Sequence, residues 1–184
     1  MLMRLLEFLL GSVVSIFGLI LVLRAWLYVW AFSPRHPIVM FTRRVSDWLI
    51  MPLSKVLHPQ GPFDVASLFS AFISAILAVA VHVIFSAGAV FSPWALVVAP
   101  VAMLVRWALE LVSWSAFLWV FLSWFSPQSP MTYALGTLIE PFMRPLRRLP
   151  LTIGRFDFSP VLLFLIANLL QSVVMPFSYA RVYF

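Results

Sequence analysis

The sequence contains no cysteine, and only 10% of its 184 residues are charged. The absence of cysteine excludes disulfide bonds, thiolate metal sites and a cysteine nucleophile. A soluble domain usually carries about 25% charged residues, so this chain has too few to cover its surface in water. Because 64% of the residues are hydrophobic, the composition predicts an integral membrane protein.

Acidic residues are also scarce, with six Asp and Glu against twelve Lys and Arg. A basic surplus is one property of nucleic-acid-binding proteins, but here it is concentrated in two loops. That pattern is typical of membrane topology and of anionic lipid surfaces. We therefore expect anionic lipid headgroups as partners, and no nucleic acid.

A block of residues, 33–64, reappears in order and without a gap at 126–157. The matching positions, among them prolines, a glycine and an acid, differ by one constant offset (126 − 33 = 93 and 157 − 64 = 93). This regularity indicates a tandem duplication of one structural unit. We place the first repeat at 1–92 and the second at 93–184.

Each repeat contains two long apolar runs. A bilayer core of about 30 Å requires about 20 helical residues, and each run is long enough to cross once. The runs cover residues 5–32, 65–87, 94–125 and 158–177. We therefore predict an all-α integral membrane protein with four transmembrane helices, and we expect Pro100 to mark the start of the regular part of the third.

Two spans per repeat make both repeats enter the membrane in the same direction, as a parallel duplication. Both loops, 33–64 and 126–157, then lie on one face. Together they hold eight basic residues, whereas the opposite face has Arg4 and Arg181 (the eight are Arg35, Arg43, Arg44, Lys55, Arg144, Arg147, Arg148 and Arg155). Because basic loops stay inside, the loops are expected to be cytoplasmic and both termini outside.

Each loop is expected to contain an amphipathic helix that lies in the interface or packs under the spans. These helices should begin at Pro37 and Pro130. They should end near Pro52 and Pro145, because proline lacks the amide that the next turn needs. After them, the sequence places a glycine for a tight reversal and an aspartate at the start of the next span, as Gly61 with Asp64 and as Gly154 with Asp157.

The second loop, EPFMRPLRRLPLTIGRFDFSP, closely resembles the signature of the YggT/YlmG family of small bacterial and plastid membrane proteins. Its last part matches the family's G-x-x-D-x-S-P element with Gly154, Asp157, Ser159 and Pro160. The first repeat departs from this pattern, since Met51 and Ser54 stand where the second has Arg144 and Arg147, and Ala66-Ser67 replaces Ser159-Pro160.

The resemblance implies two YGGT repeats, four spans and a bacterial inner membrane. It links the chain with osmotic stress and potassium homeostasis, or with cell division, and through plastid relatives with assembly of thylakoid complexes. It implies no defined biochemical activity.

Asp64 and Asp157 have two interpretations, a functional carboxylate or a helix N-cap, and the cap is favoured because each precedes an uncharged span. The arginines of the second loop also have two interpretations. They are a topology signal alone, or a shaped site for a lipid headgroup or an acidic partner, made of Arg144, Arg147, Arg148 and Arg155.

Arg24, Arg106 and Glu110 are candidate polar residues inside the predicted spans. Arg106 and Glu110 stand four residues apart, so they form a structural ion pair or line a polar site between helices. Arg24 has no counterpart in the second repeat, where Phe117 stands, and snorkelling to the headgroups is its simplest explanation. Asn168 and Gln171 are expected to form hydrogen bonds between helices.

The pattern predicts no catalytic residue, no metal site and no cofactor. His36, His58 and His82 share neither spacing nor face, and no nucleophile with a base or phosphate-binding glycine loop is present. The leading hypothesis is a non-enzymatic inner-membrane factor, a scaffold or assembly factor that supports the envelope under osmotic or division-related stress. The rival hypothesis is a channel or modulator of ion flux. It requires a homo-oligomer, because four spans alone are too few to enclose a pore.

Overall fold

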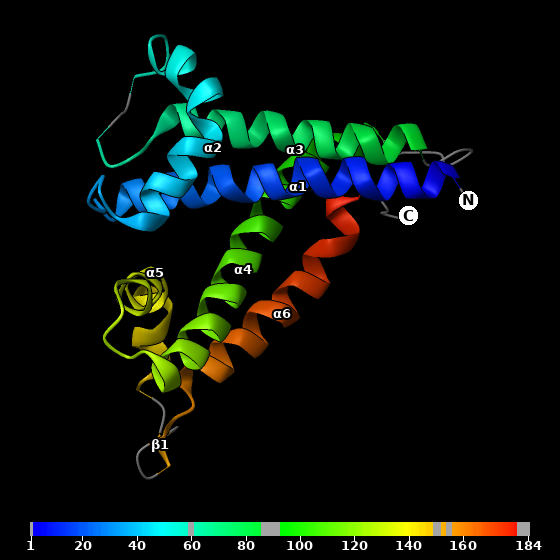
Figure 1. The fold of residues 1–184 in the computed structure, drawn as a ribbon. Helices are drawn as coiled ribbons and strands as arrows, with labels where there is room; N and C mark the ends of the chain where they lie inside the picture. Colours follow the sequence, from blue (N-terminus) through cyan, green and yellow to red (C-terminus); the bar gives the residue numbers. More distant parts are fainter. Residues whose placement is uncertain (1, 59–60, 86–92, 149–151, 154–155, 180–184) are drawn as a thin grey trace.

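The computed structural model describes residues 2–58, 61–85, 93–148, 152–153 and 156–179 (Figure 1). Within them, four helices are long and apolar enough to cross a membrane: α1 (Leu2–Val29), α3 (Val65–Phe85), α4 (Pro93–Phe125) and α6 (Ser159–Ser178). The protein is therefore a helical, multi-pass membrane protein. The ends of these four helices differ from the ends of the predicted spans by up to three residues.

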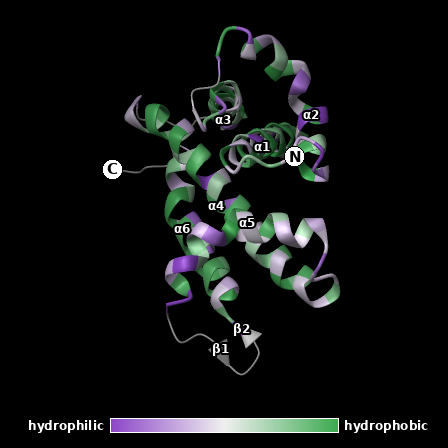
Figure 2. Ribbon diagram, turned by 90° about the vertical axis from the view of Figure 1, so that its left-hand side faces the viewer, coloured by the Kyte–Doolittle hydropathy of each residue, from purple (hydrophilic) through white to green (hydrophobic). Residues whose placement is uncertain are grey.

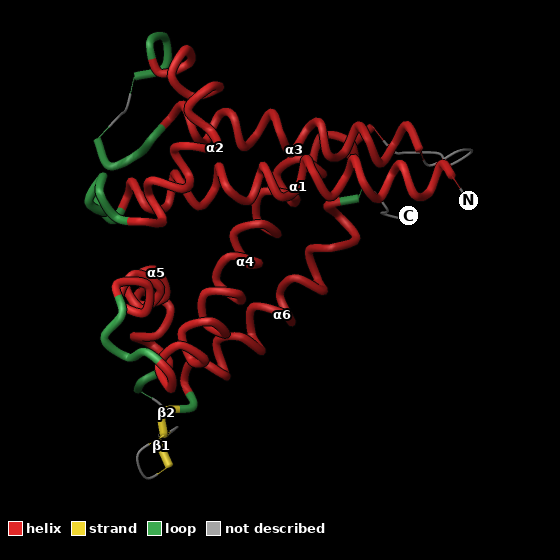
Figure 3. The backbone as a smooth tube through the Cα atoms, viewed as in Figure 1, coloured by secondary structure: helices red, strands yellow, loops and turns green. Residues whose placement is uncertain are grey.

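Two shorter helices, α2 (Pro37–Ser54) and α5 (Pro130–Leu146), connect the long ones. The strands β1 (Thr152–Ile153) and β2 (Phe156–Asp157) form a short antiparallel ladder before α6 (Figure 3). Hydrophobic residues dominate the long helices, whereas polar residues are interspersed along α2 and α5 (Figure 2). Both short helices have a side-chain cap at equivalent positions, His36 on the amide of Ile38 and Ser129 on the amide of Thr132.

The short helices end close to the expected prolines, since α2 ends at Ser54 and α5 at Leu146, with Pro52 and Pro145 in their last turns. Proline lacks the amide that a further turn needs. The structure corrects the role expected of Pro100, which lies inside α4, a helix that already begins at Pro93. Long membrane helices tolerate such a residue because neighbouring helices support the freed backbone.

The long helices pack as two hairpins, α1 with α3 and α4 with α6. In Figure 1 the hairpins cross, with α4 passing behind α1, and both α2 and α5 lie near the end of the molecule opposite the start of α1. At the crossing, buried alanines of α3 and α4 let the helices approach closely, around Met103 and Trp107 of α4. Small residues serve this purpose in membranes, where packing replaces the hydrophobic effect.

A close contact between the hairpins joins Trp107 of α4 to Gly18 of α1. Trp107 is 1% exposed, and a Cβ atom placed on Gly18 would overlap its indole ring. Gly11, two turns earlier on α1, has open space at the same position. The crossing therefore requires the absence of a side chain at Gly18 and not at Gly11.

We expect Gly18→Val to disrupt the crossing, because the indole ring has no space to retreat into. Overpacking a tight core typically costs about 1–3 kcal/mol, so the melting temperature in detergent should fall. Gly11→Ala is the control and should leave the melting temperature unchanged or higher, because alanine favours helix by about 1 kcal/mol over glycine. Equal melting temperatures for wild type and Gly18→Val would contradict this account.

Candidate functional site

The first cluster of charges joins α1, α2 and the start of α3. Arg24 of α1 forms an ion pair with Asp47 of α2 (Nη1 to Oδ1, 2.6 Å) and lies 3.7 Å from Asp64 (Nε to Oδ2). Its Nη1 also donates to the hydroxyl of Ser46 at 2.7 Å. The Arg24 guanidinium group thus faces two carboxylates of the same chain and does not extend to the lipid headgroups. Its side chain is only 15% exposed.

Asp64 has the geometry of a helix cap. Its Oδ1 accepts the backbone amide of Ser67 at 3.1 Å, and its Oδ2 accepts the Ser67 hydroxyl at 2.5 Å. Because Asp64 immediately precedes α3, it satisfies an amide that the first helical turn leaves without a partner. The same carboxylate therefore caps a span and faces Arg24.

The second cluster uses the equivalent carboxylates with a different arginine. Glu140 corresponds to Asp47 and Asp157 to Asp64 (140 − 47 = 93 and 157 − 64 = 93). Arg147 lies between them, with Nη1 at 3.3 Å from Glu140 Oε2 and Nε at 3.7 Å from Asp157 Oδ2. Arg144 adds a contact with Glu140 at 3.5 Å.

The guanidinium group therefore comes from a different part of the chain in each cluster. In the first half it comes from the span α1, and in the second from the end of α5. Phe117 occupies the position equivalent to Arg24, and Ser54 the position equivalent to Arg147. The exchange changes exposure: the Arg147 side chain is 45% exposed, three times the 15% of Arg24.

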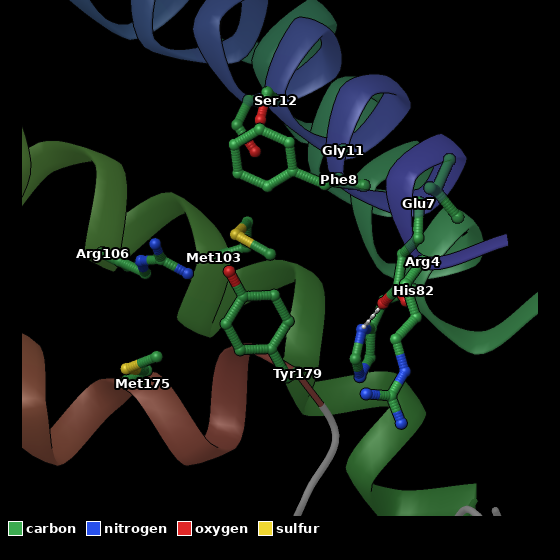
Figure 4. A pocket seen from close by; sticks show the side chains of 13 residues that line it. Arg4, Glu7, Phe8, Gly11, Ser12, His82, Met103, Arg106, Met175 and Tyr179 are labelled. Carbon is green, nitrogen blue, oxygen red and sulfur yellow. Dashed lines mark hydrogen bonds and ion pairs between the residues drawn. The ribbon is translucent and has the colours of Figure 1, made fainter. Parts of the chain in front are cut away.

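A separate cavity of about 480 Å³ lies where the two hairpins meet, and all four long helices or their ends line it (Figure 4). His82 Nδ1 lies 2.9 Å from Glu7 Oε1 in this cavity, and the His82 ring packs on Tyr179 with 4.9 Å between centroids. Arg106 lies over the same Tyr179 ring, 5.0 Å from its centroid. The cavity thus brings together ionisable residues from α1, α3 and α4.

Arg106 and Glu110 form the expected pair inside α4, with Nε 2.9 Å from Oε1. Their side chains are 21% and 19% exposed. Glu110 in addition lines a second open cavity, of about 440 Å³, with Ser113, Asn168 and Gln171. Asn168 donates to the Ser113 hydroxyl at 2.8 Å, a hydrogen bond between α6 and α4.

The remaining predicted residues occupy varied places. Gly61 has a positive φ of 59°, which suits a tight reversal. The backbone amide of Ser159 donates to Asp157 Oδ1 at 2.9 Å, and Ser159 and Pro160 are buried at the start of α6. Arg148 is exposed and forms no ion pair with another described residue. Gly154 and Arg155 lie outside the described residues.

The sequence alone assigns no partner to Glu7, Asp47 or Glu140. The offset of 93 residues pairs Asp47 with Glu140 and signals that both repeats keep an acid on the loop helix. No sequence signal links Glu7 to His82, which is 75 residues away along the chain. Among the described residues, no group of three or more His, Asp or Glu side chains is placed to hold a metal ion.

Comparison with known proteins settles the family. The model of the CCB3/YggT family matches residues 3–85 and again residues 98–178. The chain belongs to the CCB3/YggT family. Its two matches cover the α1–α3 segment and all but the first residues of the α4–α6 segment.

Similar proteins come from several bacteria. "Uncharacterized protein YggT" of Escherichia coli K12 is 34% identical over 169 residues, covering 89% of this chain and 86% of that protein. An uncharacterized protein of Haemophilus influenzae is 28% identical over 166 residues, covering 90% and 88%. One from Vibrio alginolyticus is 26% identical over 165 residues, covering 89% of each chain. No solved structure matches the chain.

The exchange of arginines predicts unequal effects of their removal. Arg24→Gln should cost about 3 kcal/mol, because it leaves Asp47 and Asp64 without their cation in a mostly buried place. Arg147→Gln should cost about 1 kcal/mol or less, because water already reaches that ion pair. The comparison is made from melting temperatures of the two variants in the same detergent, and equal losses would show that exposure does not set the cost.

Proposed function

We propose that this CCB3/YggT protein is a non-enzymatic membrane factor that scaffolds or assists assembly of other membrane components, and so supports the envelope under osmotic or division-related stress. The supporting observation is how its intramembrane charges are used. Arg24 faces Asp47 and Asp64, Arg106 is paired with Glu110, and His82 lies against Glu7. Because each of these charges has a counter-charge within the same chain, a structural role explains them without any bound or transported ion.

We further propose a parallel arrangement of two repeats in a bacterial inner membrane, with α2 and α5 in the cytoplasm and the termini outside. Three observations support it: the family match occurs twice, α2 and α5 lie near the same end of the molecule (Figure 1), and basic residues are concentrated in their segments. Their arginines are then available to anionic headgroups, Arg144 with a side chain 74% exposed.

The surface of the short helices favours a partner at this end. Trp48 of α2 is 71% exposed and Tyr133 of α5 is 74% exposed. One contact links the two helices, since Nε2 of His36, the cap of α2, lies 3.2 Å from the carbonyl oxygen of Pro130 in α5. Phe142 of α5 also packs on Trp26 of the span α1. A joined, aromatic surface of this kind can hold a second membrane protein or a second copy of the chain.

A channel or modulator of ion flux is the alternative function. The open cavity with Glu110, Ser113, Asn168 and Gln171 supports it, because these polar groups lie on a membrane-spanning face of α4 and α6. In a homo-oligomer, that face would line a path between subunits.

Topology is testable by labelling single cysteines with an impermeant thiol reagent in intact cells. Cysteine at Lys55 or Thr137, in the two loop segments, should react only after the cells are opened. Cysteine at Trp94, at the start of α4, should react before. The native chain has no cysteine, so each signal is specific. Labelling of Lys55 and Thr137 from opposite sides would contradict the parallel arrangement.

The pair in α4 separates the two functions. Arg106→Leu and Glu110→Leu should each lower abundance and melting temperature, because one charge is left alone in apolar surroundings at a cost of about 3 kcal/mol. The double Leu variant should recover stability, since replacing both partners of a desolvated pair is often neutral. Under the scaffold proposal it should also restore growth at high osmolarity in a host that lacks its own copy.

A stable double variant that fails to support such growth would contradict the scaffold proposal and favour the channel. Ion flux is then measured in proteoliposomes containing wild type or the double variant, together with particle size in detergent. A flux that wild type carries as an oligomer, and that the double variant lacks, would establish the alternative.

A further inference from the structure

The cavity where the hairpins meet has one wall of small residues. Gly11 and Ser12 of α1 lie across it from Met103 and Arg106 of α4 (Figure 4), and Ser15 of α1 also lines it. A Cβ atom on Gly11 would touch nothing within 4 Å. The cavity of about 480 Å³ falls in the range of about 300–1,000 Å³ that small-molecule sites occupy.

The cavity holds two guanidinium groups, which can only donate hydrogen bonds, against one carboxylate. Arg4 makes no ion pair with another described residue, whereas Arg106 uses its Nε toward Glu110 and its guanidinium group lies over the Tyr179 ring. The hydroxyls of Ser12 and Ser15 form no hydrogen bond with the rest of the described chain. The hydroxyl of Ser70, a buried serine elsewhere in the protein, instead donates to a backbone carbonyl group of its own helix. Glu7 is the single carboxylate of the lining, and it faces His82. A surplus of donors selects an anionic oxygen ligand.

The other lining residues are apolar. Phe8, Met103 and Met175 supply large apolar side chains to the wall. Free inorganic anions gain nothing from such a wall, whereas an alkyl chain does. The cavity is open, and its helices are apolar enough to lie in the bilayer, so a chain can leave toward the lipid.

We propose that this cavity binds one anionic lipid by its phosphate headgroup. The phosphate oxygens accept from Arg4, Arg106 and the serine hydroxyls of α1, and the acyl chain lies along Phe8 and Met175. The site lies near the start of α1 and the end of α6, away from the arginines of α2 and α5 (Figure 1). It does not depend on the proposed scaffold role, and either proposal can fail alone.

Gly11 offers a variant that blocks the cavity and keeps every charge. Gly11→Leu fills the open space and favours helix, so the protein should fold with an unchanged or higher melting temperature. Ser15→Leu, one turn further along α1, is a second blocking variant. Arg4→Gln removes one donor group at an exposed position, and Arg148→Gln is its matched control because it removes an exposed arginine from the opposite end.

The experiment measures binding to the full chain in a non-ionic detergent by native mass spectrometry. The probes are dioctanoyl-phosphatidylglycerol, dioctanoyl-phosphatidylcholine and inorganic phosphate. Wild type should retain one phosphatidylglycerol in preference to phosphatidylcholine, and phosphate should not displace it. Gly11→Leu and Ser15→Leu should lose this bound lipid. Arg4→Gln should weaken binding about fivefold, the effect of one basic residue beside an anionic lipid, and Arg148→Gln should leave it unchanged.

Three results would overturn the proposal. Wild-type affinity in folded Gly11→Leu and Ser15→Leu would place the lipid elsewhere. Equal binding of phosphatidylcholine would show that negative charge is not recognised. Inorganic phosphate binding as tightly as the lipid would show that the apolar wall contributes nothing and that the cavity holds a free anion.

Discussion

Arginine side chains cannot be left without a counter-charge among apolar helices, and this constraint shapes both halves of the molecule. Arg24 meets Asp47 on the short helix and Asp64 at the start of the next span. One guanidinium therefore ties α1, α2 and α3 together. Because Asp64 also caps α3, the electrostatic tie and the end of a span are set by the same carboxylate.

The second half meets the constraint in a different way. Glu140 and Asp157 keep the two acids, but Arg147 approaches them from the end of α5 and remains 45% exposed. A cation that water reaches is held weakly, so α5 is fastened less firmly than α2. The two halves thus have acids at equivalent positions and an arginine at different ones, and this difference makes the two short helices unequal in the strength of their attachment.

The crossing of the hairpins depends on packing and not on charge. Trp107 fits against Gly18, and alanines of α3 and α4 surround it. Two turns toward the start of α1, the small side chains of Gly11, Ser12 and Ser15 leave space that no neighbouring helix fills. Close contact around Gly18 and separation around Gly11 therefore leave a cavity with polar lining residues between the hairpins.

The sequence by itself determined the four long helices, because the length of an apolar run and the thickness of a bilayer are enough to place them. It also determined the family, through the repeated order of prolines, glycine and aspartate, and it paired Arg106 with Glu110 because helix geometry puts positions four apart on one face. Only the tertiary structure decided that Arg24 meets Asp47 and Asp64, that Arg147 performs this part in the second half, and that Glu7 reaches His82. Those contacts join residues on different helices and connecting segments, and their formation depends on the angle and depth at which the helices pack, which a periodic pattern along one helix does not specify.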